Sequence, residues 1–179
     1  MPEITITTPG VQKLLSEINP HKAHGPDNIP ARILKETASV LASILAHLFQ
    51  QSLSTGEIPT EWKLAYVTPI YKKGNREDPK NYRPMSLTSI ISKTMELILS
   101  SQIMNHLESH DILTNTQFGF RQRHSCESQL LLTTDDFARY LDNNVQVDMG
   151  ILDFSKAFDK VPRRRLAVKL NYYGIRGTC

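Results

Sequence analysis

Cysteine is scarce in this chain, since Cys126 and Cys179 are the only two among 179 residues. Two cysteines favour neither a disulfide framework nor a zinc site, and Cys126 is predicted to be a small buried thiol. His106 and His110 lie one helical turn apart. Because no third ligand is nearby, we predict two partly exposed helix residues rather than a metal site.

Long apolar runs are also missing, because none approaches the roughly 20 residues that a membrane-spanning helix needs. The first residues lack the pattern of a secretory signal. These absences predict an intracellular, soluble chain with no membrane partner. Hydrophobic residues still make up 40% of the sequence, which is enough for one globular core or for two subdomains that share one.

Acidic residues are absent from 160–179, a stretch that holds six lysines and arginines. The stretch 61–83 has six such cations against three acids, although the whole chain carries a net charge of only +3. Clustered positive charge suits a polyanion such as nucleic acid. For Arg163-Arg164-Arg165 taken alone, a solvated helix face is the favoured interpretation.

Hydrophobic spacing predicts more helix than strand, which indicates an α+β fold. Thr8 as N-cap and Pro9 at the first helical position should open a helix that ends at Asn19-Pro20. Further helices are predicted over 30–55, 89–109, 125–141 and 162–174, the first with a break point at 37–40. Strands are predicted over 65–71, 82–87 and 147–154, the first two forming a hairpin with a basic tip.

An apolar run from Val147 leads into Asp153, and a second acid, Asp159, follows six residues later. A carboxylate at the end of a buried strand is costly without a cationic partner, and a divalent metal is the usual one. Alternatively, Asp153 caps the next helix, since Asp is a favoured N-cap residue. The segment alone leaves both interpretations open.

Four segments occur in series, namely 72–74, 81–89, 117–121 and 151–161, with the sequences KKG, NYRPMSLTS, QFGFR and ILDFSKAFDKV. Together they resemble a reverse transcriptase, and more narrowly the jockey-like polymerase of non-LTR (LINE-type) retrotransposons. The resemblance covers nearly the whole chain. It implies a partial right-hand polymerase fold with a helical N-terminal extension (1–60), fingers with a β-hairpin (61–123) and an incomplete palm (124–179).

The resemblance implies two-metal nucleotidyl transfer with Mg²⁺, or Mn²⁺ as an alternative. Asp153 would be the catalytic metal ligand, assisted by the backbone carbonyl of Phe154. Phe158 would be the steric gate that prefers dNTPs over rNTPs, and its alternative role is that of an ordinary core residue. Asp159 is not assigned to the metal.

The predicted hairpin supplies the expected triphosphate contacts, because a triphosphate needs cations that also donate hydrogen bonds. Lys73 and Arg83 are favoured, with Lys72 as the alternative, since one sequence does not fix the register. For Arg76 and Lys80 a solvated turn is the accepted interpretation.

The expected template and primer contacts are Lys22, Gly25, Gln117, Gly119 and Arg121. Gly119 should allow close backbone approach or a positive φ, and the aromatic residues on either side of it fit the core at least as well as they fit base stacking. The loop around Gly25 resembles the extension that lies along the template, although its Gly-Pro-Asp sequence is also a good turn.

The chain departs from the family because it contains no Tyr/Phe-Ala-Asp-Asp motif. One carboxylate holds two metal ions poorly, so the isolated chain is predicted to be inactive. A full-length parent, acting in the nucleus, should add the endonuclease domain, the remaining palm and the thumb, and should use an RNA template, a DNA primer and dNTPs. Alternatives are a non-catalytic RNA-binding module and a group II intron maturase or telomerase-like enzyme.

Overall fold

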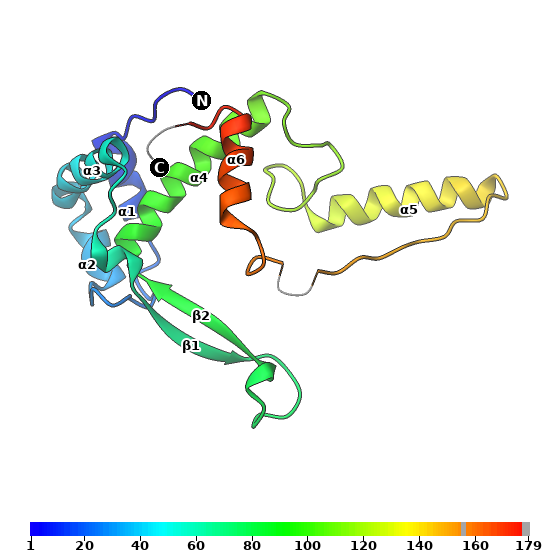
Figure 1. Cartoon of the computed structure of the whole chain (residues 1–179), viewed down its shortest axis with the longest axis horizontal. Coiled ribbons are helices and arrows are strands. Elements are labelled where there is room, and N and C mark those ends of the chain that lie inside the picture. Colours follow the sequence, from blue (N-terminus) through cyan, green and yellow to red (C-terminus); the bar gives the residue numbers. More distant parts are fainter. Residues whose placement is uncertain (155–156, 177–179) are drawn as a thin grey trace. The chain divides into compact units, whose positions relative to one another are not determined.

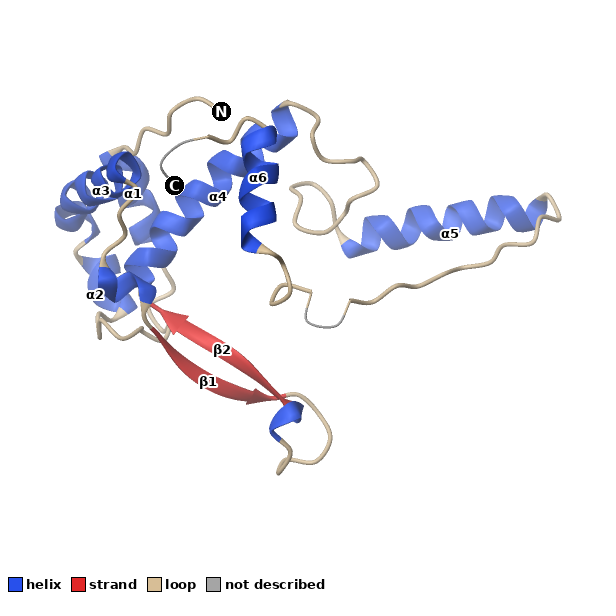
Figure 2. Ribbon diagram, viewed as in Figure 1, coloured by secondary structure: helices blue, strands red, loops and turns tan. Residues whose placement is uncertain are grey.

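A computed structural model describes residues 1–154 and 157–176 (Figure 1). The chain divides into two compact units. Unit 1 comprises Met1–Gln102 together with Arg176, and unit 2 comprises Ile103–Ile175. The division falls inside helix α4 (Ile90–Ser109). Helices are the main element throughout (Figure 2), and none in the described ranges has the length and apolarity required to cross a membrane.

Unit 1 holds a hydrophobic core between its helices. These are α1 (Thr8–Ser16), α2 (Ala31–Glu36), α3 (Ala38–Thr55) and the first part of α4. Val11, Leu15, Leu34 and Phe49 have less than 2% of their surface exposed. The ring of Trp62, on a 3₁₀ turn over Thr60–Lys63, meets Phe49 edge-on at 5.6 Å between centroids.

The first helix differs from its prediction at both ends. Thr7, not Thr8, is the N-cap, and its hydroxyl accepts a bond from the N–H of Gly10 at 3.3 Å. Pro9 is therefore the second helical residue, and α1 ends at Ser16, before the predicted Asn19-Pro20. The break in the next helix is confirmed at Thr37, whose hydroxyl bonds the carbonyl of Ile33 at 2.7 Å.

The β-hairpin of unit 1 is confirmed, with β1 at Ala65–Tyr71 and β2 at Tyr82–Thr88. The strands are antiparallel, with Ala65 opposite Thr88 and Tyr71 opposite Tyr82. β1 is exposed along its whole length, so both faces of the hairpin meet solvent. Ser89 then caps α4, since its hydroxyl accepts a bond from the N–H of Ile91 at 3.2 Å.

Unit 2 contains the end of α4, then α5 (Cys126–Asp142) and α6 (Arg163–Tyr172). Ser125 caps α5 through a reciprocal bond pair with Ser128. Among the described residues of unit 2, His106 is the only one classed as buried. The prediction that Cys126 is buried was therefore wrong, because α5 has no covering layer in this unit and the thiol is exposed.

The predicted strand over 147–154 was also wrong, because these residues are irregular and exposed. The apolar run that suggested a strand here is not sufficient to form one, because a strand needs a neighbour to satisfy its backbone groups. The only sheet in the described ranges is the hairpin of β1 and β2. Asp153 therefore follows an unpaired segment, not a buried strand.

Candidate functional site

The hairpin brings Lys72 and Arg83 to the same face. Arg83 stands opposite Ile70, and the N–H of Lys72 continues the ladder by bonding the carbonyl of Asn81 at 2.8 Å. Alternate residues of a strand share a face, so Lys72 joins Ile70 and Arg83, and Lys73 falls outside this alignment. All three cations are exposed, and in the described ranges none pairs with a carboxylate.

The tip of the hairpin is ordered by two tyrosines. The hydroxyl of Tyr71 donates to the carbonyl of Gly74 at 2.6 Å, and that of Tyr82 donates to the carbonyl of Arg76 at 2.8 Å. The two rings meet edge-to-face at 5.7 Å, and the Arg76 guanidinium lies 5.1 Å from the Tyr71 centroid. These contacts engage Arg76 in the tip itself, where the sequence predicted only a solvated turn.

The opposite face of the hairpin forms a shallow hollow of about 550 Å³. It is lined mostly by prolines and one valine, together with a tyrosine, one basic and one acidic side chain. The lining residues are Val67, Pro69, Arg76, Glu77, Pro79, Tyr82 and Pro84. The cationic face and this hollow therefore lie on opposite sides of one thin element.

Gly25 packs against the root of the hairpin. A Cβ added at Gly25 would lie 2.5 Å from the backbone nitrogen of Ser89 and 2.5 Å from the carbonyl carbon of Thr88. These two residues join β2 to α4, so the 22–27 loop rests directly on that junction. Lys22, in the same loop, is exposed. The loop thus has a packing role in addition to its expected place along the template.

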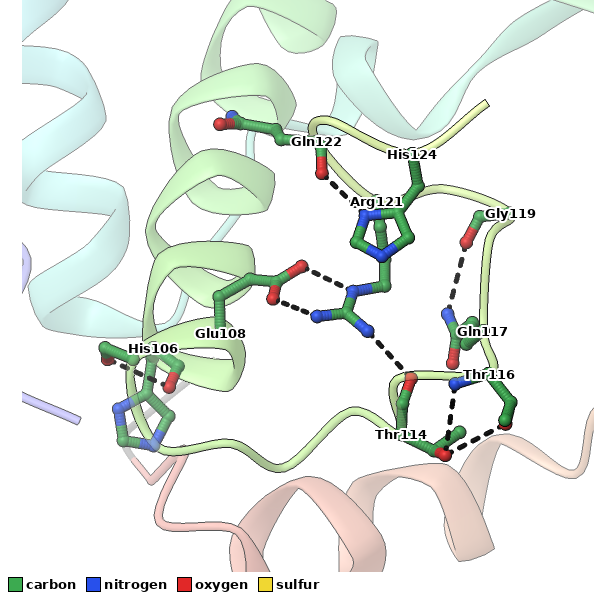
Figure 3. A network of polar contacts seen from close by, with 10 residues as sticks. His106, Glu108, Thr114, Thr116, Gln117, Gly119, Arg121, Gln122 and His124 are labelled. Atoms are coloured by element: carbon green, nitrogen blue, oxygen red, sulfur yellow. Dashed lines mark hydrogen bonds and ion pairs between the residues drawn. The ribbon is translucent and has the colours of Figure 1, made fainter. Parts of the chain in front are cut away.

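Arg121 is held inside unit 2 by three hydrogen bonds (Figure 3). Its Nε and Nη2 donate to the two carboxylate oxygens of Glu108 at 2.8 and 2.6 Å, and its Nη1 donates to the carbonyl of Thr114 at 2.7 Å. Only 8% of the Arg121 side chain is exposed. The hydrogen bonds from Arg121 lower the pKa of Glu108 below its ordinary value. This arrangement ties the 111–123 loop to the end of α4.

The neighbours of Arg121 differ from expectation in their backbone. The positive φ predicted for Gly119 occurs at Phe120 instead, with a value of 59°. A Cβ at Gly119 would meet nothing within 4 Å, so no close approach requires glycine there. The side chain of Gln117 donates to the carbonyl of Gly119 at 3.2 Å.

The rings of Phe120 and Phe158 meet in unit 2. Their centroids lie 5.9 Å apart with the ring planes at 80°, an edge-to-face pair. The two residues are 84% and 78% exposed, respectively. Neither is a core residue, so the core alternative is wrong for both.

The segment that contains Asp153 does not assemble a metal site. Asp153 is exposed, and Phe154 is 78% exposed. Within 1–154 and 157–176, no three acidic, histidine or cysteine side chains come together as a cation would require. An exposed carboxylate outside any such cluster does not match the ligand needs of Mg²⁺ in a two-metal centre, so the described residues do not fit the expected cofactor.

His106 holds the end of α4 to the end of α6, a contact that the sequence did not predict. Its Nε2 lies 2.8 Å from the carbonyl oxygen of Tyr173, while its buried Nδ1 has no hydrogen-bond partner. Its ring is 4.3 Å from that of His110. His106 is therefore buried, contrary to the predicted partial exposure, whereas His110 is exposed as predicted. His106 and Tyr173 are 67 residues apart in the sequence, so no helical or strand periodicity could have predicted their contact.

Comparison with known proteins places the chain in a family. Residues 70–178 match the family described as reverse transcriptase (RNA-dependent DNA polymerase), and the chain belongs to that family. The match begins inside β1 and covers the cationic face of the hairpin, the 117–121 segment and the segment around Asp153.

Retrotransposon polymerases are among the similar proteins. The chain is 31% identical over 161 residues to a probable RNA-directed DNA polymerase from transposon BS of Drosophila melanogaster, with 86% of the chain aligned. It is 28% identical over 162 residues to the RNA-directed DNA polymerase from mobile element jockey, with 90% aligned, and 30% identical to that of transposon X-element, with 87% aligned. The aligned part spans 18% of the length of each of these relatives. The predicted jockey-like kinship is confirmed.

Proposed function

We propose that this chain supplies the nucleotide-binding fingers of an RNA-directed DNA polymerase that copies retrotransposon RNA into DNA. The observation that carries the proposal is the pair of exposed cations, Lys72 and Arg83, on one face of an ordered hairpin within the family match. The proposed partners are an RNA template, a DNA primer and dNTPs, with the parent polymerase acting in the nucleus.

The chemistry of the two cations suits a triphosphate. An arginine can donate two parallel hydrogen bonds to phosphate oxygens, and a lysine adds a mobile point charge. Since Lys72 shares the face of Arg83, we favour Lys72 over Lys73 as the second contact. A thin hairpin ordered at its tip is able to close over a bound nucleotide as one piece.

A titration with a fluorescent dNTP tests this proposal. Lys72→Ala and Arg83→Ala should each weaken binding by about tenfold or more, because a charge-assisted hydrogen bond contributes roughly 1.5–3 kcal/mol. Lys80→Ala is the matched control, a cation of the same tip that should have little effect. Equal losses in all three variants would indicate unspecific attraction, and absence of dNTP binding would refute the proposal.

Asp153 and the Phe154 carbonyl remain our proposed metal contacts in the parent enzyme, with Phe158 as the proposed gate. The reverse transcriptase family uses a divalent metal, but the described residues do not hold one by themselves. The function proposed for this chain is therefore confined to binding, and Lys22, Gly25, Gln117 and Gly119 are its proposed template contacts. Arg121 is withdrawn from that set, because its guanidinium is occupied by Glu108 and Thr114.

A further inference from the structure

We infer that unit 2 carries an interaction surface for a second copy of this chain, in which α5 of one copy packs against α6 of the other (Figure 1). Each helix has exposed apolar side chains, and the two helices carry opposite charges. The inference goes beyond the proposed function and does not depend on it, because no residue of the hairpin takes part.

Helix α5 has a wide apolar face that is open to solvent. No residue of α5 is buried, and Leu130, Leu131 and Leu141 are each more than half exposed. Successive residues of a helix are rotated by about 100°, so these leucines fall with Phe137 and Tyr140 on one half of its circumference. A continuous apolar face of this kind, unlike a scattered surface leucine, marks a contact with another element or molecule.

Acidic side chains border this face on both sides. Around the helix, Asp142 lies about 20° from Leu131, and Asp136 lies about 40° from Tyr140. Both acids are exposed, and neither belongs to an ion pair in the described ranges. The helix has four acids against a single basic residue, Arg139. A partner for this face should therefore combine apolar and basic side chains.

Helix α6 presents such a surface, in which two apolar residues lie between two arginines. Val168 and Tyr172, one turn apart, are 71% and 82% exposed. Around the helix, Arg164 lies about 40° from Val168, and Arg165 lies about 20° from Tyr172. The sequence of α6 holds four basic residues and no acid. The exposed side of α6 thus matches the face of α5 in both apolar character and charge.

The two helices do not cover each other within one chain. No residue of α5 or α6 is buried, and the end of α6 is held to α4 by the contact between the Tyr173 carbonyl and His106 at 2.8 Å. Two copies of α5 would place acids against acids, and two copies of α6 would place arginines against arginines. Only the pairing of α5 with α6 joins opposite charges and covers apolar side chains on both helices.

This pairing closes on itself in a dimer. If α5 of one copy meets α6 of the other, a two-fold axis generates the same contact with the copies exchanged. The dimer then has two equal contacts, and neither copy keeps an open α5 face. At low concentration the copies separate, and α5 is again open to solvent.

The test is sedimentation equilibrium of the full chain over a range of concentrations. The fitted mass should rise from that of one chain to that of two and no further. Leu130→Gln should weaken dimerisation by about tenfold or more, because the contact then loses the burial of one leucine side chain. Arg32→Gln, which changes an exposed cation of unit 1, is the control and should dimerise as the wild type does.

An exchange of charges tests the pairing itself. The double variant Asp136→Lys, Asp142→Lys and the double variant Arg164→Glu, Arg165→Glu should each be monomeric, because like charges then meet at both contacts. An equimolar mixture of the two should form dimers, since opposite charges meet again at both contacts. Circular dichroism should show unchanged helix content, because lysine suits the last turn of a helix and glutamate suits the first.

Three results would overturn the inference. The first is a wild-type chain that stays monomeric at every concentration, and the second is a mass that rises above that of a dimer. The third is a failure of the charge exchange, in which either double variant dimerises alone as the wild type does or the mixture stays monomeric.

Discussion

Gly25 is the residue at which a single added methyl group should matter most. Gly25→Ala would place a Cβ 2.5 Å from backbone atoms of both Thr88 and Ser89. Because backbone atoms cannot rotate away, the loop or the hairpin root must shift, and overpacking of this kind costs about 1–3 kcal/mol. We expect urea denaturation to show that loss in the free energy of unfolding.

Gly119→Ala is the matched control for that measurement. A Cβ at Gly119 meets nothing within 4 Å, so its free energy of unfolding should stay within about 0.5 kcal/mol of the wild type. If both variants lose the same stability, the packing role of Gly25 is wrong.

The Glu108–Arg121 pair predicts a pH dependence of stability. The pKa of Glu108 is lowered in the folded protein by Arg121. A carboxyl with a lowered pKa contributes stability that is complete above its ordinary pKa of 4.5 and that is lost as the pH falls through the lower pKa of the folded state. In thermal melts at pH 7, Glu108→Gln should therefore have a lower melting temperature than the wild type. The difference between the two melting temperatures should disappear at pH values below the pKa of Glu108 in the folded protein.

At the scale of elements, two facing prolines shape the hairpin. Pro69 and Pro84 are directly opposite each other. The pair occupies a non-hydrogen-bonded position of the ladder, since the hydrogen-bonded positions alternate from Lys72 and Asn81. An N–H at either position would point outward, so the two prolines remove one donor from each outer edge of the hairpin. Prolines at sheet edges prevent other strands from adding. They leave the hairpin available for a ligand instead of another chain.

Replacing both prolines should open these edges. The variant Pro69→Val, Pro84→Val regains two outward N–H groups and two residues of high strand propensity. We expect self-association, visible as an earlier, concentration-dependent peak in size-exclusion chromatography with light scattering. A double variant that remains as monodisperse as the wild type would show that the prolines do not protect the edges.

Local patterns predicted an element well where its backbone hydrogen bonds are satisfied within the element itself. β1 was predicted at its observed bounds, since a hairpin satisfies its own ladder. The prediction of a strand over 147–154 was wrong, because local pattern alone does not show whether a second strand is present to pair with it. The candidate site was predicted in part for the same reason. The sequence identified Lys72 as a candidate contact, but only the pairing register of β1 and β2 distinguishes its face from that of Lys73. The Glu108–Arg121 pair, 13 residues apart, follows no helical or strand period.

At the scale of the whole molecule, the two units differ in how much they bury. Eleven buried hydrophobic residues form the core of unit 1, whereas the described part of unit 2 buries only His106. Local opening is easiest where few apolar contacts resist it. Hydrogen exchange should therefore be slow in α1 and α3 and fast in α5. Protection of α5 equal to that of α3 would contradict this difference.

The most direct test of the account is primer extension by the purified chain. The 179-residue chain is given a primed RNA template, dNTPs and Mg²⁺, with Asp153→Asn as the control. Because the described residues form no cluster of three histidine, cysteine, aspartate or glutamate side chains that could hold a metal ion, we predict dNTP binding through Lys72 and Arg83 but no extension above the control. Extension by the wild-type chain that Asp153→Asn abolishes would contradict the account, since this chain would then hold a complete catalytic centre.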